Sequence, residues 1–306
     1  MPIPVVDKIW MNGELVPWAD AKVHVLTHAL HYGSGVFEGI RCYDTVRGPA
    51  VFRLDEHMAR LERSAKLYYM PVPYTREELS QATKDLIKAN GLRACYIRPL
   101  VFRGYGEMGI FPLNAPVETI IAAWPWGAYL GDDAAQHGIR AKCSSVRALD
   151  NASLARAAKA CGQYLNSILA KVEVNKAGYD EAIMLNERGH VAEGSGENIF
   201  AVRRGVLMTP PVSDGILEGI TRETVIEIAA SLGIPCTERT LTRSDLVISD
   251  ELFCTGTAAE LVPIREVDDH VIGEPGPVTR RIQEKFHAIV SGRDDEFAHY
   301  MEAVEG

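Results

Sequence analysis

The sequence predicts an α+β fold of two domains, and three observations indicate it. Apolar residues alternate in short segments joined by glycine-containing turns, which is typical of antiparallel hairpins. Amphipathic helical segments stand between these hairpins, rather than one helix after every strand, which argues against a doubly wound parallel sheet. The chain has 306 residues, of which 47% are hydrophobic and 24% charged. This length and composition are enough for two domains that each bury a core.

Residues 1–126 are predicted to form a small N-terminal domain. The segment KIWMNGELVPW should be a hairpin, because Asn12-Gly13 is a strong turn signal between alternating residues. A helix is expected over residues 55–69 with Asp55 as its N-cap, and a second helix begins at Thr75, where Thr75 and Glu78 fit a capping box. The other expected strands are residues 36–44, 50–54, 93–102 and 118–126.

Residues 127–138 are predicted to be the interdomain linker, because they carry three glycines and break the periodicity. Residues 139–306 would then form the large C-terminal domain. We expect helix over most of residues 151–175, and a second helix that begins at Thr221 as N-cap and ends before Gly233. The expected strands and hairpins are residues 139–147, 180–194, 198–210 and 251–264.

The composition excludes several classes of protein. A formal net charge of −9 and a pI near 5.5 disfavour a nucleic-acid partner, which would require basic patches. The six cysteines occur singly, without a CxxC pair, so we expect no metal site. The N-terminus lacks the pattern of a signal peptide, and no segment approaches the ~20 apolar residues of a membrane span. We therefore expect a cytoplasmic protein with reduced thiols.

Lys159 is the one lysine in a stretch of small residues, ARAAKACGQYLNS, and no acidic residue stands three or four positions away. A partly exposed helix lysine and a desolvated amine are equally reasonable from this stretch alone. A desolvated amine is a nucleophile that forms Schiff bases with carbonyls, including that of pyridoxal phosphate. Five helical residues rotate by about 500°, so Lys159 and Tyr164 could serve one site only if Lys159 lies at or before the first helical turn.

Two short segments could bind the phosphate of such a cofactor. In EGITRET, Gly219 allows close approach of the backbone, while Ile220 and Thr221 open a helix whose first N–H groups favour anions. In CTGTAAE, the turn at Thr257 could present N–H groups and a hydroxyl. An ordinary helix cap and an ordinary turn are the simpler interpretations of each segment taken alone.

Two charged residues could complete the site. Glu193, at a strand end before Gly-Ser-Gly, is a candidate partner for the pyridine nitrogen, which needs an anion to stay protonated. Arg60, on the first helix, could bind the phosphate. Each residue alone is more simply a solvated side chain, so the two assignments depend on the segments around them.

The order of these segments is more specific than any one of them. With HYGSGVFEGIRCY, YIRPLVF and AAWPWGAYLG, followed by AAK, EGSGEN, LEGITR and CTGTAAE, the chain closely resembles the branched-chain amino acid aminotransferases. These belong to the fold-type IV pyridoxal phosphate enzymes, and the resemblance covers nearly the whole chain. It implies a small α/β domain and a larger β-rich pseudo-barrel domain with flanking helices. Residues 146–159 lack the proline-containing loop that many members have before the lysine.

The resemblance also implies the roles of individual residues. Lys159 forms the internal aldimine with pyridoxal 5′-phosphate, and it later moves the proton of the substrate Cα. Glu193 pairs with the pyridine nitrogen, Tyr164 bonds the ring hydroxyl oxygen, and Leu217 packs on the ring. The phosphate is bound by Arg60, Gly219, Ile220, Thr221 and Thr257.

The substrate residues follow from the same resemblance. The α-carboxylate is bound by Tyr96 with the backbone N–H groups of Thr257 and Ala258, and Arg98 binds the side-chain carboxylate of glutamate. Strand alternation supports this pairing, because it places Tyr96 and Arg98 on one face. The apolar pocket for branched side chains comprises Tyr32, Phe37, Trp126 and Tyr129.

The implied reaction is reversible transfer of the amino group of leucine, isoleucine or valine to 2-oxoglutarate, in two half-reactions. The implied partners are these small molecules and a second subunit, which makes the protein a homodimer at least. Related members of the superfamily act on D-amino acids or amines, or eliminate pyruvate from aminodeoxychorismate, and these activities remain alternatives. A binding protein on the same scaffold is a further alternative, although such a protein would need neither Lys159 nor Glu193.

Overall fold

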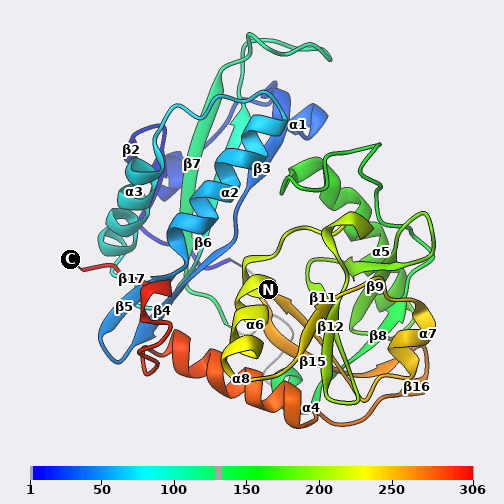
Figure 1. Ribbon diagram of the computed structural model, residues 1–306. Helices are drawn as coiled ribbons and strands as arrows, with labels where there is room; N and C mark the ends of the chain where they lie inside the picture. The colour runs from blue at the N-terminus through cyan, green and yellow to red at the C-terminus, as the bar shows by residue number, and fades with distance from the viewer. Residues whose placement is uncertain (1–2, 128–132, 306) are drawn as a thin grey trace. The chain divides into compact units, whose positions relative to one another are not determined.

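The computed structural model describes residues 3–127 and 133–305, which form two compact units (Figure 1). Unit 1 comprises Met1–Gly127, Ala158–Gly162 and Ala288–Gly306, and unit 2 comprises Ala128–Ala157 and Gln163–His287. The short segment that contains Lys159 therefore belongs to unit 1, although the residues before and after it belong to unit 2.

These units differ from the domain ranges expected from sequence, which placed all of residues 139–306 in one domain. The last strand, β17 (Met301–Ala303), pairs with β5 (Gly48–Phe52), and this pairing places the C-terminal residues in unit 1. Of the expected linker, residues 128–132 lie outside the described residues, and α4 (Ala134–His137) occupies part of the remainder.

Unit 1 contains one antiparallel sheet in the order β17-β5-β4-β6-β7-β1-β2, with β3 paired to β6. The predicted hairpin is confirmed, because Asn12 and Gly13 both have positive φ, at 49° and 99°, as a tight two-residue turn requires. The remaining strands are β1 (Lys8–Met11), β2 (Glu14–Pro17), β3 (Gly35–Phe37), β4 (Ile40–Thr45), β6 (Cys95–Arg103) and β7 (Val117–Trp124).

Helices α2 (Leu54–Leu67) and α3 (Arg76–Ala89) pack on this sheet and share its core, and α1 (His28–Tyr32) is a short helix before β3. The capping box of Thr75 and Glu78 is confirmed. The N-cap predicted for α2 was wrong, because Arg53 occupies that position in the left-handed conformation and Asp55 lies in the first turn. Arg53 packs 4.5 Å from the Tyr300 ring, and this contact from the chain terminus stabilises the cap.

Unit 2 contains a second sheet in the order β10-β9-β8-β15-β14-β11-β12-β13, with β16 paired to β15. Most of its pairs are antiparallel, while β8 pairs in parallel with β9 and β15, and β12 with β13. Its strands are β8 (Ile139–Cys143), β9 (Glu181–Leu185), β10 (Val191–Gly194), β11 (Asn198–Arg203), β12 (Val206–Thr209), β13 (Cys236–Glu238), β14 (Glu251–Gly256), β15 (Glu260–Val267) and β16 (His270–Val271).

The helices of unit 2 required two corrections. The helix expected over residues 151–175 is only α5 (Tyr164–Lys176), because the residues before it form turns and extended chain. Helix α6 (Ile220–Ser231) has Gly219 as its N-cap, so Thr221 lies inside the helix. The other helices are α7 (Arg243–Val247) and α8 (Pro277–Val290), and α8 continues into unit 1.

The α+β class is confirmed by these two sheets with their flanking helices. Over residues 3–127 and 133–305, no helix combines the length and apolar character needed to cross a membrane.

Candidate active site

Lys159 lies in an extended segment of unit 1, ahead of α5, so the condition set by its spacing from Tyr164 is met. Its backbone N–H donates to Ser64 Oγ at 3.1 Å, and its carbonyl accepts from the Phe37 N–H at 3.0 Å. Ala158 and Ala160 are buried in the core of unit 1. Since side chains alternate along extended chain, Lys159 emerges on the opposite face, with Nζ 5.2 Å from the centre of the Phe37 ring.

Arg60 lies on α2, one turn before Ser64, and its guanidinium is bound to a carboxylate. Its Nε and Nη2 donate to the oxygens of Glu38 at 2.7 and 2.8 Å, and His57 Nδ1 lies 2.7 Å from the same carboxylate. All three side chains are buried. Burial lowers the pKa of His57, and its Nε2 is buried without a hydrogen-bond partner.

Tyr96 and Arg98 share one face of β6, as strand alternation predicts. Arg98 Nη2 donates to the Tyr96 hydroxyl at 3.1 Å, and the guanidinium carbon lies 4.5 Å from the centre of the Phe37 ring. Arg98 Nε is buried, and none of the residues that the structure describes accepts a hydrogen bond from it. This cation is therefore surrounded by aromatic groups and retains a donor that an acid could use.

Aromatic rings extend this arrangement beyond Tyr96. The Trp124 and Trp126 rings lie 5.3 and 4.9 Å from the Tyr96 ring. Gly39 lies against the Tyr96 hydroxyl, since an added Cβ would come within 2.0 Å of that oxygen. Gly39 therefore allows the backbone to approach Tyr96.

Glu193 lies on β10 in unit 2, and donors that include a guanidinium, a backbone N–H and a side-chain amide hold its carboxylate. Arg156 Nη2 binds one oxygen, and the Leu217 N–H and Asn198 Nδ2 donate to the other at 2.9 and 3.2 Å. A guanidinium in contact with a carboxylate favours its ionised form. The carboxylate therefore has a cationic partner and is held in a fixed orientation.

The N-terminus of α6 begins at Gly219, without a side-chain cap. An added Cβ at Gly219 would lie 1.9 Å from Asn198 Oδ1, so only glycine fits beside that side chain. Asn198 Nδ2 also donates to the Leu217 carbonyl at 3.0 Å. Asn198 thus joins the Glu193 carboxylate to the segment that leads into α6.

Thr257 and Ala258 lie in the turn between β14 and β15, where both are half-buried. Thr255, at the end of β14, is buried, and its Oγ1 has no hydrogen-bond partner. An unsatisfied buried hydroxyl next to this turn indicates a place where a polar group could bind.

Several predicted residues are brought together within each unit. In unit 1, Phe37 contacts Lys159 and Arg98, and Arg98 contacts Tyr96. In unit 2, Glu193 contacts the Leu217 N–H. Tyr32 differs from these residues in its surroundings, because it is exposed on α1 and its ring stacks on the His28 ring, with ring centres 4.4 Å apart.

The remaining predicted residues lie at element ends. Tyr164 is the first residue of α5 and is half-buried. Ile220 and Thr221 open α6 and are buried. Tyr129 lies outside the described residues.

Four residues with contacts at the site were missed from sequence: Glu38, His57, Arg156 and Asn198. Arg156 was the easiest of the four to predict from sequence, because it is a second cation within the small-residue stretch before Lys159. Asn198 closes the segment EGSGEN, five residues after Glu193, so that segment contained a signal for it. Glu38 and His57 gave no signal, since they lie 19 residues apart in the chain.

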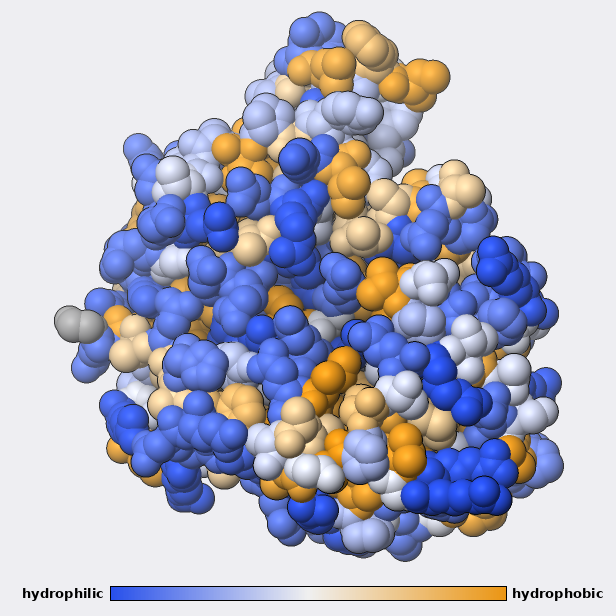
Figure 2. Space-filling model, viewed as in Figure 1, coloured by the Kyte–Doolittle hydropathy of each residue, from blue (hydrophilic) through white to orange (hydrophobic). Residues whose placement is uncertain are grey.

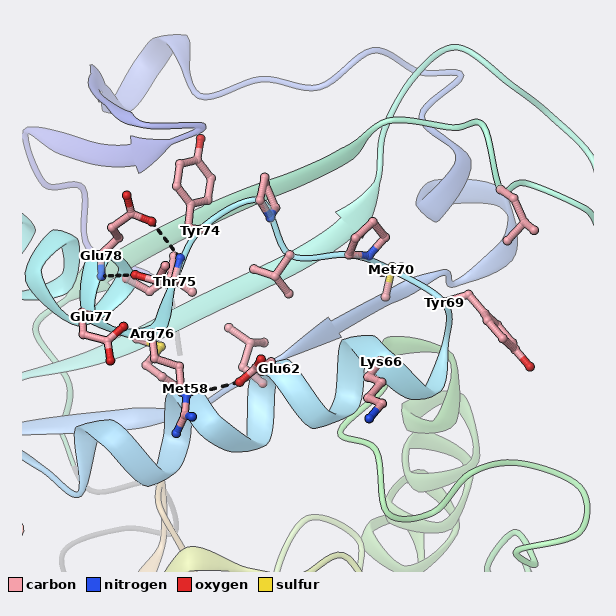
Figure 3. A pocket seen from close by; sticks show the side chains of 16 residues that line it. Met58, Glu62, Lys66, Tyr69, Met70, Tyr74, Thr75, Arg76, Glu77 and Glu78 are labelled. Atoms are coloured by element: carbon pink, nitrogen blue, oxygen red, sulfur yellow. Dashed lines mark hydrogen bonds and ion pairs between the residues drawn. The ribbon is translucent and has the colours of Figure 1, made fainter.

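Unit 1 also contains a pocket of about 950 Å³ between α2, the α2–α3 connection and the first turn of α3 (Figure 3). Among the predicted site residues that the structure describes, none lines it. Its charged lining includes the ion pair of Arg76 with Glu62, at 3.2 Å, and the capping box of Thr75 and Glu78. These contacts serve the connection of the two helices.

The residues present fit the pyridoxal phosphate that the resemblance implies. Glu193 offers the fixed anion that a protonated ring nitrogen requires. The N-terminus of α6 has backbone N–H groups without a side-chain cap, which suits a phosphate. The unsatisfied Thr255 hydroxyl is a further polar group that a ligand could satisfy.

Comparison with known proteins shows the family of the chain. The family described as Amino-transferase class IV matches residues 35–267. The branched-chain-amino-acid aminotransferase of Escherichia coli K12 is 48% identical over 301 residues, covering 97% of each chain. The chain belongs to the class IV aminotransferases, among the branched-chain-amino-acid aminotransferases.

Solved structures of such aminotransferases share the fold. The crystal structure of the Escherichia coli enzyme has a TM-score of 0.95, with 48% identity, and covers 98% of this chain and 100% of that chain. The structure of the T.th. enzyme complexed with N-(5′-phosphopyridoxyl)-L-glutamate has a TM-score of 0.94, with 46% identity. The match covers 98% of this chain and 99% of that chain. The fold-type IV architecture expected from sequence is therefore confirmed.

Proposed function

We propose that the protein is a pyridoxal-phosphate-dependent transaminase that moves the amino group of L-leucine, L-isoleucine or L-valine to 2-oxoglutarate. The family membership supports the reaction class, and the T.th. relative carries a phosphopyridoxyl-glutamate ligand. The observation that carries the proposal is the setting of Arg98, a cation among aromatic rings whose Nε finds no acceptor among the described residues.

One site must accept an apolar side chain and then the carboxylate of glutamate. An arginine that is largely withdrawn from water and left unpaired with leucine bound would be costly, and Arg98 is half-buried. Arg98 avoids this cost, because its Nη2 is bound to Tyr96 and its face lies on Phe37. When glutamate is the substrate, the side-chain carboxylate would bind the remaining donors of Arg98.

The other substrate contacts in this proposal follow the family pattern. Tyr96 and the backbone N–H groups of Thr257 and Ala258 bind the α-carboxylate. Phe37, Tyr32 and Trp126 surround the branched side chain, and Tyr129 is proposed to join them.

The cofactor residues are proposed in the same way. Pyridoxal phosphate, when bound, supplies a carbonyl for the amine and a ring that withdraws electrons. Lys159 Nζ attaches the cofactor and is the base that removes the Cα proton of the amino acid. Glu193 holds the ring nitrogen, Tyr164 the ring hydroxyl oxygen, and Leu217 covers the ring. The phosphate is bound by Arg60, Thr257, Gly219, Ile220 and Thr221.

The test is the absorbance spectrum of the purified protein with pyridoxal phosphate, before and after addition of L-leucine and then 2-oxoglutarate. We expect a visible band that disappears with leucine and returns with the keto acid. A band that responds to D-alanine or an amine, but not to L-leucine, would contradict the substrate assignment. Absence of any band would contradict the role of Lys159.

We also propose that the protein is at least a homodimer. In unit 2, α5 exposes Leu165, Ile168, Leu169 and Val172 on one face. In unit 1, the connection between β6 and β7 exposes Ile110 and Phe111, and hydrophobic side chains gather at its tip (Figure 2). Exposed apolar groups of this kind are typical of subunit interfaces.

The oligomer is tested by light scattering after size-exclusion chromatography. We expect a dimer or larger species for the wild type, and dissociation when Leu165 and Leu169 are both replaced by Glu. A monomeric wild type would contradict the proposal. The cytoplasmic location remains a proposal that rests on the sequence alone.

A further inference from the structure

Arg156 is a buried arginine in unit 2 that directly contacts Glu193. Each of its three nitrogens has a partner: Nε donates to the Gly215 carbonyl at 3.0 Å, Nη1 to Gln163 Oε1 at 3.3 Å, and Nη2 to Glu193 Oε1. Gln163 is itself held, since its Nε2 donates to the Ala155 carbonyl at 2.8 Å. The guanidinium is therefore fixed in one position against the carboxylate.

We infer that Arg156 tunes Glu193, so that the carboxylate holds the proton on the cofactor ring nitrogen less strongly than an unshared carboxylate would. This inference rests on the proposed role of Glu193. Oε2 of Glu193 is bound to two neutral donors, the Leu217 N–H and Asn198 Nδ2. Arg156 brings a full positive charge to the carboxylate, and Glu197 is an acid close enough to interact with it.

Two effects of Arg156 oppose each other. Complete ordering of one glutamate side chain would strengthen its bond to the ring nitrogen by at most about thirtyfold. The Leu217 N–H and Asn198 Nδ2 already hold Oε2, so the share of this ordering that Arg156 supplies is less than about tenfold. The Arg156 guanidinium and the protonated ring nitrogen are two cations that share one carboxylate, so they repel each other. At an effective dielectric constant near 20, this repulsion weakens the binding of the protonated nitrogen to the carboxylate by about tenfold or more. The charge effect is therefore the larger, and Arg156 weakens the electron-withdrawing power of the bound ring.

The test compares two ligands with the full-length protein stripped of cofactor. The dissociation constant is measured by tryptophan fluorescence for pyridoxal phosphate and for an analogue in which carbon replaces the ring nitrogen. The ratio of the two dissociation constants reports only the interaction of Glu193 with the ring nitrogen, because the two ligands share all their other contacts. Arg156→Gln keeps a donor and removes the charge, so we expect the preference for pyridoxal phosphate to rise about tenfold. Arg156→Lys keeps the charge and should stay within about threefold of wild type.

The comparison of these variants separates the effect of the Arg156 charge from any structural effect of the substitution. An unchanged or reduced preference in Arg156→Gln would overturn the inference. Arg140, whose guanidinium binds Glu266 and the Gly178 carbonyl elsewhere in unit 2, supplies the control Arg140→Gln. An equal rise in that control would also overturn it. In a Glu193→Gln background the effect of Arg156→Gln should vanish, and persistence would show that it does not act through Glu193.

A second variant covers the case in which Arg156→Gln does not fold. Gln163→Glu keeps the arginine and places a second carboxylate on its Nη1, which should raise the preference about threefold. No rise would overturn the inference. A wild type that does not prefer pyridoxal phosphate over the analogue would instead remove the proposed role of Glu193.

Discussion

Glu38 and Arg60 form an ion pair with two hydrogen bonds in the interior of unit 1, from Nε to Oε1 at 2.7 Å and from Nη2 to Oε2 at 2.8 Å. Burial alone would raise the pKa of Glu38. The Arg60 guanidinium and His57 outweigh burial and lower that pKa far below its usual value. The edge of the Arg60 guanidinium that carries Nε and Nη2 is therefore fixed by the Glu38 carboxylate within unit 1.

We expect Glu38→Gln to lower the free energy of unfolding at pH 7 by about 3–5 kcal/mol, because the buried Arg60 loses its counter-charge. Since the folded state keeps Glu38 ionised, the unfolded state binds more protons once the pH falls below about 4.5. The stability that the pair contributes is complete above that pH and is lost towards acid. The variant should therefore differ less from wild type at pH 3 than at pH 7.

Urea-induced unfolding of both proteins from pH 3 to pH 7 measures this difference. The exposed pair of Asp44 and Arg93 has the same two-bond geometry, so Asp44→Asn is the matched control and should have a much smaller effect. Equal losses for the two substitutions would show that burial adds nothing to the Glu38 pair.

Glu197 should give the opposite dependence on pH. Burial raises its pKa to about 8, the neighbouring Glu181 adds to this rise, and Lys171 opposes it. Because the folded state binds more protons than the unfolded state up to that pKa, stability should fall as the pH rises from about 4.5 to about 8. The slope for one group is at most about 1.4 kcal/mol per pH unit.

Glu197→Gln cannot ionise, so its unfolding free energy should change less than that of wild type between pH 5 and pH 8. Urea-induced unfolding over this range checks the prediction. Glu187→Gln, at an exposed position in the same unit, should follow the wild-type curve. Parallel curves for wild type and Glu197→Gln would contradict the raised pKa.

Local signals predicted most of the fold, because turns and caps depend on residues that are close in sequence. The Asn12-Gly13 turn and the capping box at Thr75 are examples. The N-cap of α2 was mispredicted because Arg53 is held by Tyr300, and a contact between distant segments has no local signature. The helix expected before α5 is absent because Ala160 forms a bridge with Val36, which overrides the helical propensity of alanine and lysine.

The sequence allowed site residues to be proposed where they fall in short motifs, as with Lys159, Glu193 and Gly219. The charged groups around them were not predicted. Glu38 and Arg156 each bind partners far along the chain, and buried ion pairs show no periodicity in sequence. Such groups orient the motif residues. The sequence therefore indicates which residues carry the reaction better than it indicates which buried charges adjust their position and charge.

Lys159→Ala should abolish transamination while the fold remains intact. The side chain emerges from a segment that is anchored by Ala158 and Ala160 in the core, so its removal leaves no core cavity. Turnover of L-leucine and circular dichroism are measured together. Lys176→Ala, at an exposed position at the end of α5, should keep wild-type activity. Retained turnover in Lys159→Ala would end its assignment as the attachment site.

Arg98→Ala should reduce kcat/KM for glutamate more than for leucine. Removal of a charge-assisted hydrogen bond costs about 1.5–3 kcal/mol, or roughly tenfold to a hundredfold, while leucine loses only the packing of the guanidinium on Phe37. Steady-state kinetics with both amino acids give the ratio. Arg41→Ala, whose guanidinium lies over Tyr43 on the neighbouring strand β4, should leave the ratio unchanged. Equal losses in Arg98→Ala would mean that Arg98 does not bind the side-chain carboxylate.

Gly39→Ala should raise KM for the amino acids by about tenfold while cofactor affinity is kept. The new Cβ would lie 2.0 Å from the Tyr96 hydroxyl oxygen, and Tyr96 cannot move freely because it is buried beside Trp124 and Trp126. The displaced hydroxyl would then no longer meet Arg98 or the substrate. Gly127→Ala is the control, since its added Cβ would have no atom of a non-neighbouring described residue within 4 Å.

The role of the Tyr96 hydroxyl in this effect can be isolated by a second substitution. Tyr96→Phe removes the oxygen that the new methyl group would strike, and leaves the ring carbon 2.9 Å away as the nearest atom. Gly39→Ala should therefore raise KM less in the Tyr96→Phe background than in wild type, because the substitutions share one contact. Additive effects would show that Gly39→Ala acts on the backbone, whereas a smaller combined effect ties the glycine to the position of the tyrosine hydroxyl.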